Sequence, residues 1–324
     1  MRISEARGIQ GPKSIKPTHP NFSLRQLVDH VRPNEEEIHL VRDRFGIVHS
    51  ALARAYPGLR FLPIGSHSRG TAIAVHSHVD FLAVLPSEWA TWGGRGVSPL
   101  TMIDRLTENL RYSQLALAPQ VRRDDRGVEL YFHGAIFAVD VIPGFFVRSA
   151  DQYPVYLLPG DDNQWIEASP ERHNALFSMS NTGCGTKLRA ISQLVKVWRF
   201  ARSPPLGLSS LYVDMLLATS DIGKGVKSYG QCMNDFFNEL VRQRMRCLSD
   251  PANVSGVLVA SPSNDRLERL YDAAKVAATH AQAALDAQAR GAYSDANREW
   301  EAIFKRRLAR RRYSGKFIFC RNTL

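Results

Sequence analysis

GSHSRGTAIAVHSHVDFLAVLP, residues 65–86, joins a turn rich in Gly and Ser to an apolar run with the alternation of a β-strand. Side chains two positions apart share one face of a strand, so His78 and Asp80 point to one side. Val79 and Phe81 point to the other side. The stretch therefore predicts a strand that presents a polar pair on one face.

A second apolar run, FAVDVIPGF at residues 137–145, contains a single acid. By the same alternation, Asp140 lies on the face opposite the valines beside it. An unpartnered carboxylate inside an apolar strand is costly, which favours a functional role for both Asp140 and Asp80. Carboxylates on two strands could converge on a divalent ion such as Mg²⁺, which prefers oxygen ligands. We therefore predict that Asp80 and Asp140 are catalytic metal ligands, with His78 beside them.

The turn before the first strand has the composition of a phosphate-binding loop. Gly65 lets the backbone approach a ligand closely, and exposed N–H groups with the Ser66 hydroxyl can hold a phosphate. Gly70 and Thr71 form a second such pair in the same stretch. Phosphoryl transfer needs a phosphate beside a metal, because its catalysis rests on positioning and charge neutralisation. Gly65 and Ser66 are therefore predicted to bind the phosphate end of a substrate.

The positive charge of the chain is concentrated at its C-terminus. The net charge is +11 over 324 residues, but residues 305–324 hold eight Lys and Arg and no acid, so the rest carries only +3. One interpretation of this tail is a solvated chain end. The other is a segment that binds nucleic acid or a protein partner.

Hydropathy and cysteine content suggest where the protein works. The N-terminal residues MRISEARGIQGPKSIKP lack the apolar segment of a secretory signal, and no later run of about 18 apolar residues could span a bilayer. The four cysteines are widely spaced and form no CxxC pair, which predicts free thiols. We expect a cytoplasmic protein without a membrane-bound part.

The first half of the chain mixes strand and helix patterns after an irregular start. An Asn cap at position 34, followed by acids and helix-spaced apolar residues, predicts a long helix that ends near Pro57. RFLPIG and VDFLAVLP are predicted strands, and Ser98 with Pro99 begins a further helix. VELYF and AIFAVDVIPGF are predicted to form a hairpin around His133 and Gly134.

The second half is predicted to be helical. From about residue 171 the strand patterns fade, and four helical patterns follow, the last of them alanine-rich. We therefore predict an α+β, bilobed protein. Its parts are a mixed-sheet lobe with a long N-terminal helix at residues 1–170, a helical lobe at 171–304 and the basic tail at 305–324. A cleft between two lobes is where ligands tend to bind.

These motifs resemble those of a known family. GSHSRGTAIAVHSHVDFLAV is similar to the signature of polymerase-beta-like nucleotidyltransferases, and closely to that of the bacterial cGAS/DncV-like nucleotidyltransferases, or CD-NTases, of CBASS anti-phage systems. The similarity continues through VDVIPGF, YLLPGDDNQWIEASPERHN, KLRAISQLVKVWRFARSPPLGLSSLYVDML and the last helix, which ends WEAIF. It covers most of residues 34–304, and it implies the bilobed polymerase-beta-like fold.

The resemblance also implies an activity. Such an enzyme joins ribonucleoside triphosphates, ATP, GTP or others, into a cyclic di- or trinucleotide and releases pyrophosphate, and the product activates a downstream effector. It implies that Asp80 and Asp140 hold Mg²⁺ and that Asp140 activates the attacking hydroxyl. The implied nucleotide contacts are Ser66, Lys187, Lys196, Ser210 and Tyr212. The sequence pattern alone is equally consistent with solvated lysines, and it favours a core position for Tyr212.

One position departs from the family pattern. Relatives carry aspartate where this chain has His78, which leaves two acids in place of three. Imidazole is a poor ligand for Mg²⁺, whereas Mn²⁺ accepts nitrogen more readily, so a site with altered metal preference is one possibility. A catalytically impaired nucleotide- or RNA-binding homologue is another. A nucleotidyltransferase that makes a linear product or modifies another acceptor is a third.

Overall fold

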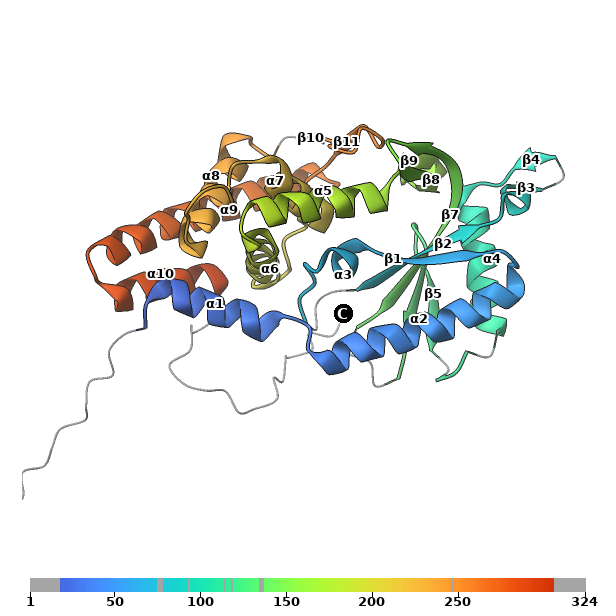
Figure 1. Cartoon of the computed structure of the whole chain (residues 1–324), viewed down its shortest axis with the longest axis horizontal. Coiled ribbons are helices and arrows are strands. Elements are labelled where there is room, and N and C mark those ends of the chain that lie inside the picture. Colours follow the sequence, from blue (N-terminus) through green and yellow to red (C-terminus); the bar gives the residue numbers. More distant parts are fainter. Residues whose placement is uncertain are drawn as a thin grey trace, which may run out of the picture.

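The computed structural model describes residues 18–305, without 75–77, 93, 114, 118, 134–136 and 246. Within these residues the protein is α+β and has two lobes, one built around a mixed sheet and one made of helices (Figure 1). This agrees with the fold class predicted from the sequence. The basic tail, interpreted above either as a solvated end or as a segment that binds nucleic acid or a protein, lies outside the described residues except for Lys305.

The chain enters through two helices and then builds the sheet. The elements up to the end of the sheet are α1 (Pro20–Val31), α2 (Glu35–Ala55), β1 (Arg60–Ile64), α3 (Gly65–Arg69), β2 (Val79–Leu85), β3 (Thr91–Trp92), β4 (Arg95–Gly96), α4 (Pro99–Tyr112), β5 (Gln120–Arg123), β6 (Val128–Tyr131), β7 (Val139–Ala150), β8 (Tyr153–Pro159) and β9 (Trp165–Ala168). The remaining elements are α5 (Pro170–Gly183), α6 (Lys187–Phe200), α7 (Ser210–Thr219), α8 (Tyr229–Arg242), β10 (Leu248–Ser249), β11 (Val257–Leu258), α9 (Asn264–Ala289) and α10 (Tyr293–Phe304).

Seven strands form the main sheet, and β7 is its centre. The order is β1-β2-β7-β6-β5, and β8 and β9 extend the sheet from the second half of β7. The β2–β7 pair is parallel, while the other pairs in this sheet are antiparallel. The first half of β7 therefore lies between β2 and β6, the two strands that supply the side chains described below.

One face of the sheet is buried under α2 and α4. Val48 and Leu52 of α2 and Met102 of α4 pack with Phe81 and Val139, all of them buried. Local sequence fixes these helices, because Asn34 and Glu37 form a capping box before α2, and Ser98 caps α4 ahead of a proline. Both helices and strands β1, β2, β6 and β7 confirm the sequence-based assignment.

The opposite face carries the polar residues. Ile64, Leu82 and Val84 form a small apolar cluster with Tyr156 on this face. Because side chains alternate along a strand, Asp80 lies on the same face as Leu82 and Val84. The pair of acidic residues is therefore separated by the sheet from the α2–α4 core.

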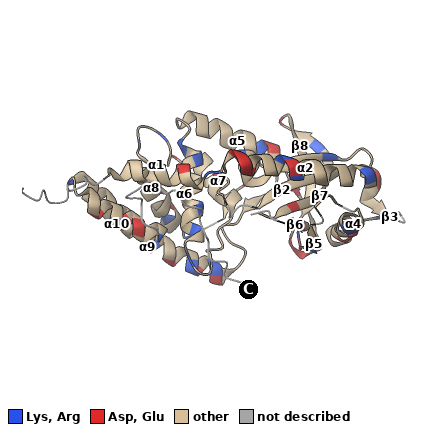
Figure 2. Ribbon diagram, turned by 90° about the horizontal axis from the view of Figure 1, so that it is seen from below, with Lys and Arg blue, Asp and Glu red and all other residues tan. Residues whose placement is uncertain are grey.

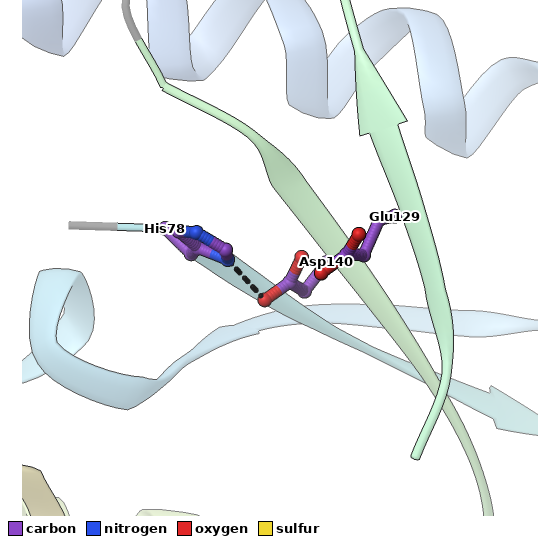
Figure 3. A group of neighbouring side chains, drawn as sticks. All are labelled: His78, Glu129 and Asp140. Carbon is purple, nitrogen blue, oxygen red and sulfur yellow. Dashed lines mark hydrogen bonds and ion pairs between the residues drawn. The ribbon is translucent and has the colours of Figure 1, made fainter. Parts of the chain in front are cut away.

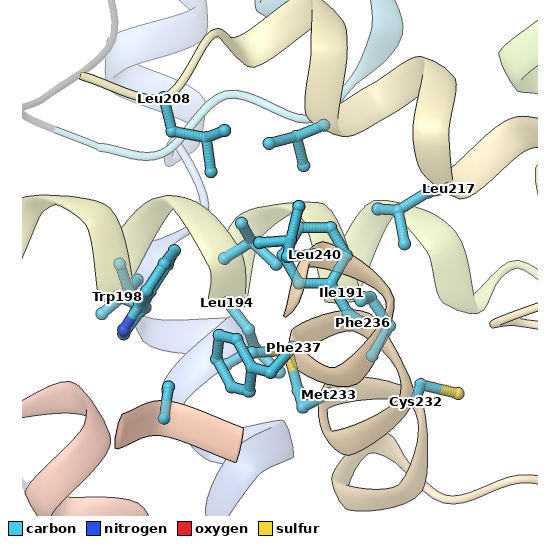
Figure 4. Packing of buried hydrophobic residues seen from close by; sticks show 14 of the residues in the cluster. Ile191, Leu194, Trp198, Leu208, Leu217, Cys232, Met233, Phe236, Phe237 and Leu240 are labelled. Carbon is cyan, nitrogen blue, oxygen red and sulfur yellow. The ribbon is translucent and has the colours of Figure 1, made fainter. Parts of the chain in front are cut away.

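The helical lobe has its own core, centred on α6. Trp198, Leu194 and Ile191 of α6 pack against Phe236 and Phe237 of α8 (Figure 4). The buried face of α9 consists largely of alanines, at positions 274, 277, 281, 284 and 287. Small side chains let α8 and α10 lie close to α9, so this core is tightly filled.

α1 was not predicted, and it belongs to the helical lobe. Its buried residues Leu24, Leu27, Val28 and Val31 join the core that contains Trp198. Figure 1 shows α1, in dark blue, beside α10, while α2 runs along the sheet. α1 therefore packs with the helical lobe although it precedes residue 170, because spacing along the chain does not show which lobe an amphipathic helix will cover.

Charge and hydropathy of the described residues add two findings. Lys and Arg residues are spread over both lobes (Figure 2). None of the helices in the described part of the chain combines the length and the apolarity that a bilayer-spanning helix needs.

Candidate active site

Asp80 and Asp140 are direct neighbours across the parallel strand pair. The register of β2 and β7 places Asp80 opposite Asp140. Adjacent strands lie about 4.8 Å apart, and side chains at paired positions point to the same face. The sequence predicted which face each acid would occupy, and the structure adds that the two acids stand side by side. Their role as metal ligands remains a prediction.

The Gly65 turn lies against Asp80. Ile64, the last residue of β1, pairs with Asp80, and Gly65 begins α3 directly afterwards. Gly65 has φ +72°, and a Cβ built on it would overlap Oδ2 of Asp80. Only glycine fits both the backbone and the space, so the chain reverses over the carboxylate at this point.

Ser66 is the second residue of this turn and is buried. Its carbonyl accepts the N–H of Thr71 at 2.9 Å, and α3 ends at Gly70, which has φ +68°. The first turn of α3 and the two acidic strands therefore meet at one end of the sheet. This is the arrangement expected if Gly65 and Ser66 bind phosphate next to a metal.

His78 forms a hydrogen bond to Asp140. Nδ1 of His78 lies 2.9 Å from Oδ2 of Asp140, with half of the imidazole exposed (Figure 3). This bond raises the pKa of His78, although burial acts in the opposite direction. Burial raises the pKa of Asp80 to about 7, and the neighbouring Asp140 carboxylate adds to that rise. The group therefore concentrates negative charge that one histidine offsets.

Glu129 completes the group, and sequence reasoning missed it. In the antiparallel pair of β6 and β7, Glu129 stands opposite Asp140. Ligand atoms of His78, Glu129 and Asp140 all lie within 4.8 Å of one another, and Asp140 is in the middle (Figure 3). A signal was present in VELYF, where Glu129 alternates with two apolar residues, but the strand register was needed to interpret it.

Several known structures have a similar fold. CdnC of E. coli MS115-1, solved with ATP, is 17% identical to this chain; the match covers 90% of this chain and 99% of CdnC, with a TM-score of 0.71. DncV of Vibrio cholerae, a cyclic AMP-GMP synthase solved with the linear intermediate 5′ pppA(3′,5′)pG, is 13% identical, with coverage of 91% and 98% and a TM-score of 0.68.

A third similar structure comes from another genus. The CD-NTase CdnG of Bradyrhizobium diazoefficiens, solved in complex with GTP, is 12% identical, with coverage of 88% and 98% and a TM-score of 0.64. The chain has the CD-NTase fold. No protein-family model and no curated protein matches the sequence. The resemblance seen in the sequence motifs is therefore confirmed at the level of the CD-NTase fold.

A buried polar network connects the two lobes of this CD-NTase fold. The carboxylate of Asp214 on α7 accepts hydrogen bonds from Nε of Arg69 at 2.7 Å, Oγ1 of Thr71 at 2.9 Å and Oγ of Ser192 at 2.5 Å. Burial acts to raise the pKa of Asp214, but Lys196, Arg69 and the hydrogen bonds outweigh it and hold the pKa below its usual value. The network joins the end of α3 to α6 and α7.

Lys196 is a member of this network. Its Nζ donates to the carbonyl oxygen and to Oγ1 of Thr71, both at 2.8 Å, and lies 3.8 Å from Oδ1 of Asp214. Burial lowers the pKa of Lys196 to about 8. The ammonium group is enclosed and bonded within the protein, and the implied contact of Lys196 with a nucleotide phosphate remains a prediction.

Lys187 and Ser210 have other partners. Nζ of Lys187, at the start of α6, donates to the carbonyl oxygens of Gly225 and Lys227 at 2.8 and 3.3 Å. The hydroxyl of Ser210, at the start of α7, accepts a hydrogen bond from Arg199 at 3.2 Å. These partners all belong to the helical lobe, and the roles of Lys187 and Ser210 toward a nucleotide remain predictions.

Tyr212 does not present its ring to a ligand. The side chain is fully buried in the core of the helical lobe, and burial raises the pKa of Tyr212 to about 12. The ring is enclosed in this structure, and the implied stacking on a base remains a prediction. The apolar pattern of SLYVDML already favoured this core position.

Proposed function

We propose that this protein is a nucleotidyltransferase that joins ribonucleoside triphosphates into a cyclic di- or trinucleotide. The pairing of Asp80 with Asp140 beside the Gly65 turn carries this proposal. The structures of similar fold support it, because one is a cyclic AMP-GMP synthase and others were solved with ATP or GTP. The proposed product is a messenger for anti-phage defence that acts on an effector in the cytoplasm.

The residues fit a divalent cation. Oδ1 of Asp140 is buried and has no hydrogen-bond partner among the described residues, although buried carboxylate oxygens are nearly always partnered. With Asp80 alongside, the group offers the oxygen ligands that Mg²⁺ prefers. Asp80 and Asp140 would hold the ion. A bound divalent ion would neutralise charge on the phosphates and on the leaving pyrophosphate.

The residues of the chain would position both reactants. Gly65 and Ser66 would bind the triphosphate of one nucleotide, while Asp140 would accept the proton of the hydroxyl of the other. The hydroxyl oxygen forms a bond to the α-phosphorus, and the bond from the α-phosphorus to the bridging oxygen breaks. Pyrophosphate leaves with that electron pair. A second step of the same kind closes the ring.

Product analysis tests the proposal. The purified chain is incubated with the four ribonucleoside triphosphates and Mg²⁺ or Mn²⁺, pyrophosphate release is followed, and the products are identified by mass spectrometry. Asp140→Asn should lower the rate by on the order of 100-fold or more, because it removes a metal ligand. Asp125→Asn, at a position whose side chain is 95% exposed, is the control and should leave the rate unchanged. A linear product would disprove ring formation, and transfer to RNA, protein or a small molecule would identify another acceptor.

A second candidate function follows from the hydrogen bond between His78 and Asp140. This bond occupies one oxygen of the carboxylate that is proposed to hold the metal. The protein would then bind a nucleotide or RNA without turning it over. Triphosphate binding measured by calorimetry, with no pyrophosphate released in either metal, would favour this second candidate.

A further inference from the structure

We propose that Glu129 is the third carboxylate of the metal centre, and that Glu129, Asp140 and His78 together hold a divalent ion of the Mn²⁺ class. This inference rests on the proposed function, because it concerns the same site. It assigns a ligand that the sequence motif does not contain. It also gives a chain with histidine at position 78 three acids in one row across the sheet.

The strand register places the three acids in one row. Asp80 on β2 pairs with Asp140 on β7, and Asp140 pairs with Glu129 on β6. Paired positions on adjacent strands point to the same face of a sheet. The row therefore crosses three neighbouring strands, with Asp140 at its centre. Three acids on one face repel one another unless a cation lies between them.

The distances fit a shared ion. One ligand atom each from His78, Glu129 and Asp140 lies within 4.8 Å of the others. Two atoms bound to one ion at about 2.2 Å each are at most about 4.4 Å apart. Small side-chain rotations therefore suffice to bring these three residues onto one ion.

One atom of the group points to such a ligand, and a neighbouring side chain orients Glu129. Oδ1 of Asp140 is buried and lacks a hydrogen-bond partner within the described part of the chain. Glu129 is held in place by the hydroxyl of Tyr131, which donates to Oε2 of Glu129 at 2.8 Å. The guanidinium of Arg122 stacks on the ring of Tyr131 at 4.8 Å. Hydrogen bonds of this kind from a neighbouring side chain orient metal-binding carboxylates.

The donor set selects the kind of ion. Mg²⁺ demands oxygen ligands and tolerates nitrogen poorly, whereas Mn²⁺ binds imidazole and carboxylate in one site. His78 supplies the nitrogen, and its exchange of the hydrogen bond to Asp140 for a metal bond frees Oδ2 of Asp140. Mn²⁺ should therefore bind more tightly than Mg²⁺.

Metal binding, measured apart from turnover, tests the inference. Mn²⁺ is titrated into the full chain, with and without a non-hydrolysable ATP analogue, and free Mn²⁺ is followed by electron paramagnetic resonance. Glu129→Gln should weaken Mn²⁺ binding by about tenfold or more, and Tyr131→Phe by a smaller factor. Glu88→Gln, an exposed position in the same lobe, is the matched control. Circular dichroism and thermal unfolding verify that each variant folds.

The outcomes separate this inference from the proposed function. Unchanged Mn²⁺ affinity in Glu129→Gln, or no Mn²⁺ binding by the unsubstituted chain under either condition, overturns the inference. If Glu129→Gln releases pyrophosphate at the full rate, the inference about Glu129 is rejected and the proposed function is retained. Weakened Mn²⁺ binding in Glu129→Gln, in a protein that releases no pyrophosphate, supports the metal centre and rejects the proposed reaction.

Discussion

Nδ1 of His78 and Oδ2 of Asp140 are 2.9 Å apart, so a histidine is bonded to the carboxylate at the centre of the acidic row. Relatives are expected to carry aspartate in place of this histidine. The hydrogen bond makes His78 a partner of the site even when no metal is bound. Substitution of this one residue therefore changes both the charge of the site and the partner of Asp140.

His78→Asp should raise turnover in Mg²⁺. The change provides a hard oxygen ligand and removes the imidazole, so Mg²⁺-dependent pyrophosphate release should increase by on the order of 100-fold, and the advantage of Mn²⁺ should shrink. Rates are measured in each metal for both proteins, with Asp140→Ala as the inactive reference. Equal and robust Mg²⁺ rates in both would show that position 78 does not contact the metal.

Gly65→Ala should lower turnover strongly and stability only moderately. The new Cβ would overlap Oδ2 of Asp80 in a backbone with φ +72°, so turnover should fall by more than about tenfold and stability by about 1–3 kcal/mol. Gly291→Ala is the matched control, since φ there is +74° and nothing lies within 4 Å. Gly291→Ala should show the backbone strain alone and keep full turnover. A comparable loss of turnover in both variants would show that backbone strain causes it, and that Gly65 has no specific role in the reaction.

Asp214→Ala should be strongly destabilising. It would leave Arg69 and Lys196 buried without their carboxylate, and breaking a buried ion pair in this way costs about 3–5 kcal/mol. Urea unfolding followed by circular dichroism measures the change. Asp221→Ala removes an exposed acid that pairs with Lys224 on the surface, and its unfolding midpoint should stay where it is. A midpoint for Asp214→Ala equal to that of the control would mean that the network does not hold the lobes together.

Lys196 should contribute a distinctive pH dependence. Its pKa is about 8 when folded and 10.5 when free, so between these values the unfolded chain binds more protons at this lysine. Stability contributed by Lys196 should therefore rise with pH through that window. Comparison with Lys196→Met isolates the effect, because the other titrating groups are shared. Between pH 8 and 10, the free energy of unfolding of the unsubstituted protein should rise relative to that of Lys196→Met. If the two free energies change with pH in parallel, the ammonium group of Lys196 is more exposed to water than the structure indicates.

Much of the fold could be predicted because it is encoded locally. The capping box at Asn34, the Ser98 cap and the alternating strands predicted α2, α4 and the central strands correctly. α1 was missed although Leu24 and Val28 have helical spacing, because its first residue is a proline in an apparently irregular segment. α10 was not predicted as a helix of its own, since the alanine-rich pattern ends near Gly291, where α9 ends.

Those features of the site that depend on a single strand could be predicted from the sequence. Alternation put Asp80 and Asp140 on defined faces, but it could not pair them, because register depends on contacts between strands. Glu129 became visible only through that register. Lys196 and Tyr212 were assigned to nucleotide binding by resemblance, and the sequence did not show that Lys196 joins a buried network. Their roles toward a nucleotide remain predictions. Helical spacing indicates which face of a helix a residue occupies. Whether its side chain is buried depends on which other elements pack against that face.

The position of α1 has a consequence for the way the chain is made. Asn297 in the last helix donates a hydrogen bond to the carbonyl of Thr18, which lies 279 residues earlier. At ordinary rates of translation, the ribosome needs on the order of tens of seconds to cover that distance. The core that Leu24 and Val28 enter also contains α6 and α8, which are made before α10. The nascent protein therefore carries an uncovered apolar helix until α6 and α8 have been made, and a chain cut short before α6 would leave this apolar surface exposed to chaperones and proteases.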